Sequence, residues 1–297
     1  MRRWWLNWKL WTGFLALAGA IAVFFSLNSD TPRLALFWVF GLAFGFIVQR
    51  SRFCFVSAIS NFFLFKDVRL LKGILGGLFV ATIGFSIIMY RQVSDPSSGI
   101  PATAYVAPFG WHLVLAGLLF GLGMMLAGGC IMGTLYRIGE GAVTSLVALL
   151  GIIIGMGVLQ HNWSWWWNSY ISHLPNVWLP AHIGWIPAVL LTLAAIGLLY
   201  WLVSSRKNPD ADAVADDSKT SAESVPLKSR LSGVGKGIFV HRWPMALSGV
   251  ILGVVNILLY QTAERPWGLT GEVMRWTQNA LDVVRLPAPP LATVPGT

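Results

Sequence analysis

Residues 117–133, which read GLLFGLGMMLAGGCIMG, decide the class of this protein. The segment begins as an apolar run of the kind that forms a membrane helix. It then reaches Gly128, Gly129 and Cys130, where the paired glycines favour a turn over a continued helix. Irregular backbone inside a membrane is tolerated only where protein buries it or where it lines a polar cavity. The segment therefore predicts a membrane helix that breaks beside a cysteine.

The composition of the whole chain agrees with a membrane protein. Of its 297 residues, 56% are hydrophobic and 11% are charged, whereas a typical soluble domain has about 25% charged residues. The two cysteines are too few for a disulfide scaffold. The net charge of +9 comes from short clusters of Lys and Arg between apolar runs. Such clusters orient helices in a bilayer, so we do not interpret the charge as a nucleic-acid footprint.

Seven apolar runs predict an all-α, polytopic membrane protein. They cover residues 10–27, 34–48, 70–90, 111–126, 142–159, 184–203 and 245–260. A shorter run at 54–65 is expected to join the 34–48 run as one broken crossing, because this places the positive cluster of Lys66, Arg69 and Lys72 in the cytoplasm. The basic residues before the first run predict a cytoplasmic N-terminus by the same rule.

We expect three regions along the chain. Residues 1–203 form a first membrane bundle that carries both cysteine motifs. Residues 204–241 are rich in Asp, Ser, Ala and Lys, and they lack the apolar surface that would offset chain entropy, so they are expected to be a cytoplasmic hydrophilic linker. Residues 242–297 begin a second repeat and end in a Pro-rich tail.

An internal repeat relates the two cysteines. The segment GLAFG at 41–45 recurs as GLLFG at 117–121, and a cysteine follows the first glycine at the same offset in both copies. Glycines spaced four apart allow helix backbones to approach closely. A third copy, GVILG, lies at 249–253. One more repeat length beyond it would fall past Thr297, so if the second bundle repeats the first, we expect its later half to be absent from this chain. The protein would then be naturally short, the chain would be a fragment, or a partner would supply the rest.

Both cysteines are expected to lie where a membrane helix breaks. Broken helices near the middle of a membrane form substrate sites in many transporters, since the exposed N–H groups of a half-helix attract anions. A thiol is a soft, weak S–H donor that suits a ligand whose accepting atom is sulfur or selenium. Charged side chains at this depth are costly unless they face water or one another. The candidate substrate-path residues are Cys54, Cys130, Gly128, Gly129, Gly133, Arg50, Arg52, Arg137 and Glu140, with Arg137 and Glu140 alternatively forming a structural ion pair.

Four segments resemble the YeeE/YedE family of bacterial inner-membrane proteins. They read SRFCF at 51–55, GGCIMG at 128–133, RIGEG at 137–141 and PWGLTG at 266–271, and the resemblance extends over about residues 34–276. It implies an inverted-repeat bundle with broken or re-entrant half-helices that takes up thiosulfate across the inner membrane. It also implies that Cys54 and Cys130 pass the anion along a central path by S–H···S contacts, that some members act in selenium metabolism, and that a small cytoplasmic sulfur-carrier protein of the TusA type cooperates.

Two other functions compete with a permease. A membrane thiol oxidoreductase that cycles a Cys54–Cys130 disulfide is disfavoured, because the chain has no C-x-x-C motif. A non-transporting subunit could instead dock a soluble sulfur carrier through residues 204–242. We expect no enzyme activity, metal or cofactor, because the five histidines are scattered and no phosphate-binding glycine motif is present.

Overall fold

The structure is a computed structural model, and it describes residues 2–97, 99–101, 104, 106–205 and 243–284. Most of the hydrophilic segment predicted at 204–241, and the Pro-rich tail after residue 284, lie outside the described residues. The chain divides into two compact units, residues 1–46 and 47–297, each of which is described by itself.

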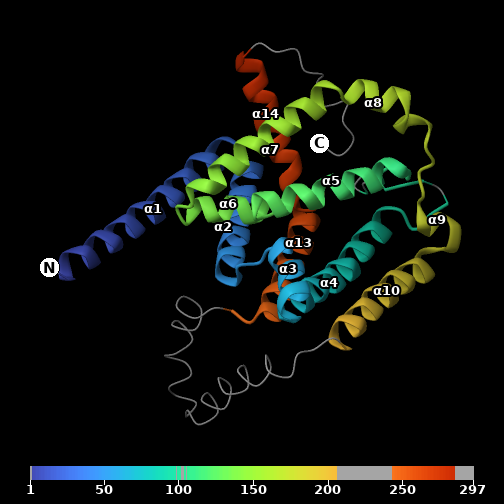
Figure 1. Cartoon of the computed structure of the whole chain (residues 1–297), viewed down its shortest axis with the longest axis horizontal. Helices are drawn as coiled ribbons and strands as arrows, with labels where there is room; N and C mark the ends of the chain where they lie inside the picture. The colour runs from blue at the N-terminus through green and yellow to red at the C-terminus, as the bar shows by residue number, and fades with distance from the viewer. Residues whose placement is uncertain (1, 98, 102–103, 105, 206–242, 285–297) are drawn as a thin grey trace, which may run out of the picture. The chain divides into compact units, whose positions relative to one another are not determined.

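The described part of the chain contains helices and connecting loops and no strand, which confirms the prediction of an all-α protein. The long helices are α1 (Arg2–Asp30), α2 (Pro32–Ser51), α4 (Arg69–Gln92), α5 (Trp111–Ala127), α7 (Val143–His161), α10 (Trp185–Ser205), α13 (Met245–Ala263) and α14 (Leu269–Val284). The shorter ones are α3 (Phe55–Phe65), α6 (Ile131–Gly139), α8 (Trp163–Ser169), the 3-10 turn η1 (Ile171–His173) and α9 (Leu179–Ile183). Figure 1 shows their order along the chain.

Within the part of the chain that the structure describes, six helical stretches are long and apolar enough to cross a membrane, so the protein is a multi-pass membrane protein. Two of these stretches, Pro32–Phe65 and Trp111–Gly139, are each interrupted. The first breaks between α2 and α3, and the second breaks between α5 and α6. The breaks fall at the two cysteines, as the sequence predicts.

In the first unit, α1 and the beginning of α2 form a helical hairpin. Pro32 starts α2 immediately after the turn that follows Asp30, a position where proline is tolerated because its missing N–H would have no helical partner. The Trp38 indole N–H donates to the Ala20 carbonyl at 3.1 Å and ties the two helices together.

The closest helix pair of the second unit is α4 with α13. Gly77 lies against the backbone of Gly249, and Gly73 lies against the backbone of Met245. A methyl group at any of these glycines would overlap a carbonyl group of the partner helix, so the backbones touch only because the side chains are absent. The glycine spacing predicts this kind of contact at 249–253. The equivalent contact is not found at Gly117 and Gly121, where a methyl group would meet no described atom of their own unit within 4 Å.

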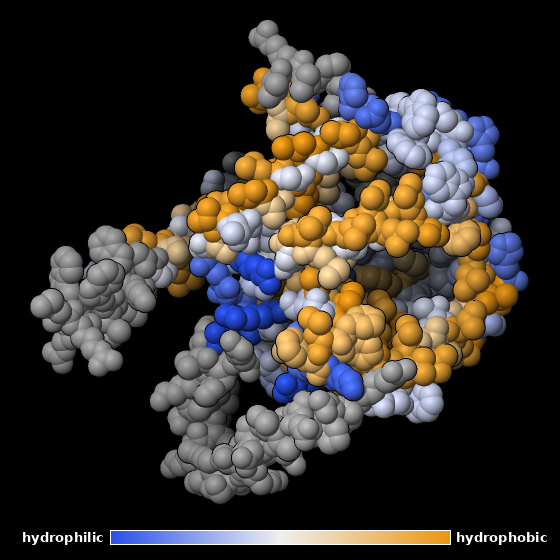
Figure 2. Space-filling view, viewed as in Figure 1, coloured by the Kyte–Doolittle hydropathy of each residue, from blue (hydrophilic) through white to orange (hydrophobic). Residues whose placement is uncertain are grey.

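Other helix pairs complete the second unit. Helix α10 packs on α4 through an apolar cluster of Val68, Leu75, Ile196 and Val203. Helix α14 packs on α7, where the Gln160 amide donates to the Gln278 side chain. Helix α5 buries none of its side chains. In the view of Figure 2 its surface and that of α7 are largely apolar, as expected for helices that face lipid.

Candidate functional site: two thiols at two helix starts

Cys54 and Cys130 come together although they are 76 residues apart in sequence. Their Sγ atoms lie 3.8 Å apart, and both residues are buried and free of disulfide bonds. Each is the N-cap residue of a half-helix, Cys54 of α3 and Cys130 of α6. The first N–H groups of a helix have no partner within the helix, and they place a partial positive charge at its start. Two such helix starts therefore converge on one pair of thiols.

The breaks that create these helix starts have local causes. Helix α5 ends at Gly128, whose φ of 66° is the left-handed conformation that glycine adopts without strain. After it, Cys130 is extended (φ −77°, ψ 175°) and its Sγ accepts a hydrogen bond from the Gly133 N–H at 3.4 Å. On the other side, Arg52 has a φ of 49°, and Cys54 is extended before α3 begins. The backbone turns of the two segments are thus similar without being identical.

Gly133 makes room for the thiol pair. A methyl group at Gly133 would lie 2.8 Å from the Sγ atom of Cys54 and 3.7 Å from that of Cys130. The first distance is shorter than carbon and sulfur tolerate, so any side chain here would push the thiols apart. By contrast, a methyl group at Gly129 would meet its nearest atoms at 3.5 Å, an ordinary contact. Of the predicted glycines, Gly133 has the most direct effect on the distance between the thiols.

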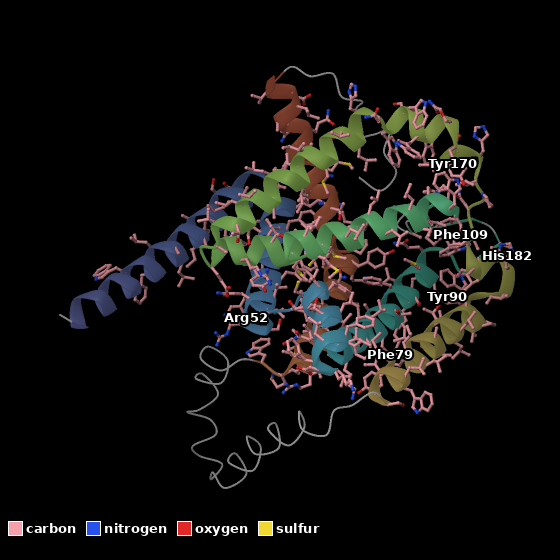
Figure 3. All side chains as sticks on the ribbon, in the orientation of Figure 1. Arg52, Phe79, Tyr90, Phe109, Tyr170 and His182 are labelled. Atoms are coloured by element: carbon pink, nitrogen blue, oxygen red, sulfur yellow. The ribbon has the colours of Figure 1, made fainter. Side chains whose placement is uncertain are left out.

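The predicted charged residues surround α6. A guanidinium nitrogen of Arg52 lies 3.8 Å from a carboxylate oxygen of Glu140, the residue that caps the end of α6. Arg137, in the last turn of α6, donates a hydrogen bond to the Gly128 carbonyl and so holds the turn between α5 and α6. The structural ion pair considered for Arg137 and Glu140 is not found among the described side chains, because each has a different partner. Arg50 is half-buried in the last turn of α2, and Figure 3 shows Arg52 just beyond it.

Electrostatically, this arrangement favours an anion with a soft atom. Two helix starts and the guanidinium groups supply positive potential, and the thiols supply polarizable sulfur. Within the described residues, no three His, Cys, Asp or Glu side chains gather in a way that could hold a metal ion.

Thr134 is a buried polar residue beside Cys130 that is not among the substrate-path residues predicted from the sequence. It is buried with 2% of its surface exposed, and its hydroxyl oxygen would lie 3.6 Å from a methyl group placed on Gly129. Its signal was present, because Thr134 is a polar residue one helical turn after Cys130 in an otherwise apolar segment.

Residues 50–289 match the family model described as sulphur transport, and this range contains both thiols and every charged residue of the site. The chain belongs to the sulphur transport family. This is the YeeE/YedE family that the motifs around Cys54 and Cys130 resemble, and the relatives' names support it. The family is one of transporters and not of enzymes.

Three relatives in the sulphur transport family illustrate the similarity. The probable transporter YedE of Salmonella typhimurium strain LT2 is 32% identical over 56% of this chain and 38% of its own length. The thiosulfate transporter TsuA of Escherichia coli strain K12 is 25% identical over 75% of this chain and 59% of its own length. The thiosulfate transporter TsuA of Spirochaeta thermophila is 36% identical over 46% of this chain and 39% of its own length. This chain thus spans between 38% and 59% of the length of these three relatives.

Proposed function

We propose that this chain conducts a sulfur-containing anion of the thiosulfate type across a bacterial inner membrane, and that the anion passes the Cys54–Cys130 pair. The observation that carries the proposal is the 3.8 Å contact between two buried free thiols at the starts of two half-helices. The names of the TsuA relatives support the choice of thiosulfate.

The chemistry of thiosulfate suits both parts of the site. Its sulfonate oxygens are hard acceptors for backbone N–H groups and guanidinium groups. Its terminal sulfur is a soft acceptor for a thiol S–H. The thiols exchange weak S–H···S hydrogen bonds with the passing anion, so no covalent bond forms or breaks. Weak contacts favour conduction because the anion must leave as readily as it binds.

The rest of the proposal concerns the setting of the protein. The positive clusters favour a cytoplasmic N-terminus and a cytoplasmic location for residues 204–241. In that location, the basic part of this segment could receive a TusA-like sulfur carrier on the side where the anion emerges. The division into a first bundle (1–203), a linker (204–241) and a second repeat (242–297) belongs to the same proposal.

Uptake of labelled thiosulfate into vesicles that contain only this chain tests the function. We expect uptake by the wild-type chain and a loss of at least about tenfold in Cys54→Ser and Cys130→Ser, because a hydroxyl is a harder partner for sulfur. Ser86→Ala is a matched control, since the Ser86 hydroxyl donates only within α4, to the Thr82 carbonyl. Undiminished uptake in both cysteine variants would refute a thiol path. Alkylation followed by mass spectrometry separates a permease, whose thiols stay free during transport, from an oxidoreductase that forms a disulfide.

A further inference from the structure

The ion pair between Arg52 and Glu140 joins the two cysteine segments at a second point. Arg52 lies two residues before Cys54, and Glu140 caps the helix that begins at Cys130. Helix α6 has nine residues and is therefore about 14 Å long. The thiols lie at its start and Glu140 lies at its end. The site therefore has two places, a thiol pair at the start of α6 and an ion pair at its end.

The surroundings of α6, taken over both ends of the helix, have an excess of positive charge. Glu140 contacts Arg52, whereas the Arg137 side chain reaches back to the Gly128 carbonyl, just before the start of α6. Arg137 donates to the neutral Gly128 carbonyl, so its charge is not compensated by that contact. The side chain of Arg52 is 55% exposed and that of Glu140 is 34% exposed, so the rest of the chain encloses neither of them. An uncompensated positive charge at an accessible position raises the local concentration of anions.

The contact between Arg52 and Glu140 is weak enough to be exchanged. At 3.8 Å it is longer than a hydrogen bond, and half-exposed ion pairs contribute only about 0–1 kcal/mol. A guanidinium group presents five N–H donors in a planar fork that matches the oxygens of an oxyanion. A doubly charged oxyanion that makes two such hydrogen bonds is a better partner for Arg52 than Glu140 is.

We propose that Arg52 is an anion-binding station, that Glu140 is its resident counter-ion, and that the oxygens of the transported anion displace Glu140. This inference rests on the proposed function and adds its charge-recognition step. Because the two places lie at opposite ends of α6, the anion uses them in succession: Arg52 holds its oxygens, and the thiols then receive its sulfur. When the anion moves on, Glu140 returns to Arg52 and keeps the anion from binding too tightly.

The test is direct binding of labelled thiosulfate to the purified full chain in lipid nanodiscs. Glu140→Gln removes the competing carboxylate, so we expect the dissociation constant to fall about two- to fivefold. Arg52→Gln should raise it at least about tenfold, and Arg52→Lys, which keeps the charge but loses the fork, should lie between. Asp67→Asn is the matched control: it breaks the Asp67–Arg69 pair, which includes neither Arg52 nor Glu140, and should leave the dissociation constant unchanged. Thermal unfolding of each variant verifies that it is folded.

Each outcome separates the two proposals. An unchanged or higher dissociation constant in Glu140→Gln would show that Glu140 is a structural clamp and would overturn the inference. Wild-type binding that Arg52→Gln leaves intact would also overturn it. If the wild-type chain binds no thiosulfate, the proposed function fails, and the inference is then judged with labelled sulfate, whose oxygens need Arg52 but not the thiols. If Glu140→Gln binds sulfate more tightly than the wild type does, the result would support Arg52 as an anion-binding residue. If the two bind sulfate equally, the result would overturn it.

Discussion

At the scale of single residues, the site depends on the absence of a side chain at Gly133. Gly133 has no side chain at the point where the two thiols meet, and a methyl group there would lie 2.8 Å from the Sγ atom of Cys54. The surrounding atoms cannot relax freely, because Cys54 is completely buried. The identity of residue 133 therefore controls the distance between Cys54 and Cys130.

Gly133→Ala should reduce thiosulfate uptake at least about tenfold while the protein stays folded, since alanine favours a helix but displaces the thiol. Gly139→Ala on the same helix is the control, because its methyl group would have no described atom within 4 Å. Uptake into vesicles and thermal unfolding are measured for both. Equal uptake in the two variants would contradict a role for the thiol distance.

Asp67, in the loop between α3 and α4, accepts two hydrogen bonds from the side chain of Arg69, the first residue of α4, at 3.1 Å each. Burial raises the pKa of its carboxyl, but the hydrogen bonds and charge of Arg69 outweigh this and hold the pKa below its ordinary value. A lowered pKa in the folded state stabilises the protein above the ordinary pKa of about 3.9, and this contribution is lost as the pH falls through the folded-state value.

Asp67→Asn should therefore lower the stability at pH 7 by about 1 kcal/mol or less, given how exposed Arg69 is. The difference between the variant and the wild type should shrink below about pH 4. Thermal unfolding across this pH range measures it. A difference that stays constant down to about pH 3 would mean that the effect does not come from ionised Asp67.

At the scale of helices, the contact between α4 and α13 determines how the second unit is held together. A methyl group at Gly77 would overlap the Gly249 carbonyl group, whose carbon would lie 2.9 Å away. Backbone atoms of two long helices cannot move apart locally, so the whole interface must separate.

Gly77→Ala should destabilise the protein by about 1–3 kcal/mol or more. Gly76→Ala, one residue earlier, should be neutral or slightly stabilising, because its methyl group would meet only a Val250 side chain at 3.9 Å and alanine favours the helix. Thermal unfolding in detergent compares the two. Similar stability for both variants would contradict the close backbone contact.

The helices and their breaks could be predicted from the sequence because their signals are local. Apolar runs show where helices lie, and Gly128, Gly129 and the repeated cysteine offset show where they break. The partners of side chains could not be predicted in the same way. Arg52 finds Glu140 across the fold, although Arg137 is much nearer to Glu140 in sequence. Likewise, Gly73 and Gly77 have the same spacing as the glycine pairs of the repeat, and spacing alone does not say which pairs meet.

Helix α14 shows a second limit of the sequence. Its buried residues, Val273, Met274 and Thr277, alternate with the charged Glu272 and Arg275, so it is amphipathic and lacks the continuous apolar run that marks a membrane span. Its contact with α7 through Gln160 and Gln278 depends on two polar side chains that sequence patterns would assign to the surface.

At the scale of the whole molecule, large apolar side chains are exposed along the described helices, whereas the two thiols are buried. Leu122 and Leu126 on α5 are 62% and 91% exposed, whereas Cys54 is fully buried. A soluble protein has the opposite distribution, because polar side chains are hydrated favourably by water and apolar ones are not. In a membrane the exposed leucines face lipid at no cost, and the buried half-helix starts are shielded from it.

The 3.8 Å between the two sulfur atoms also has a consequence for metal toxicity. Two Zn–S bonds of about 2.3 Å at the tetrahedral angle place their sulfurs about 3.8 Å apart. A zinc ion that reached Cys54 and Cys130 could replace their protons and be chelated by both without moving the backbone. If a sulfur anion passes from one thiol to the other, as we propose, the same spacing leaves its path open to blockage by thiophilic metals.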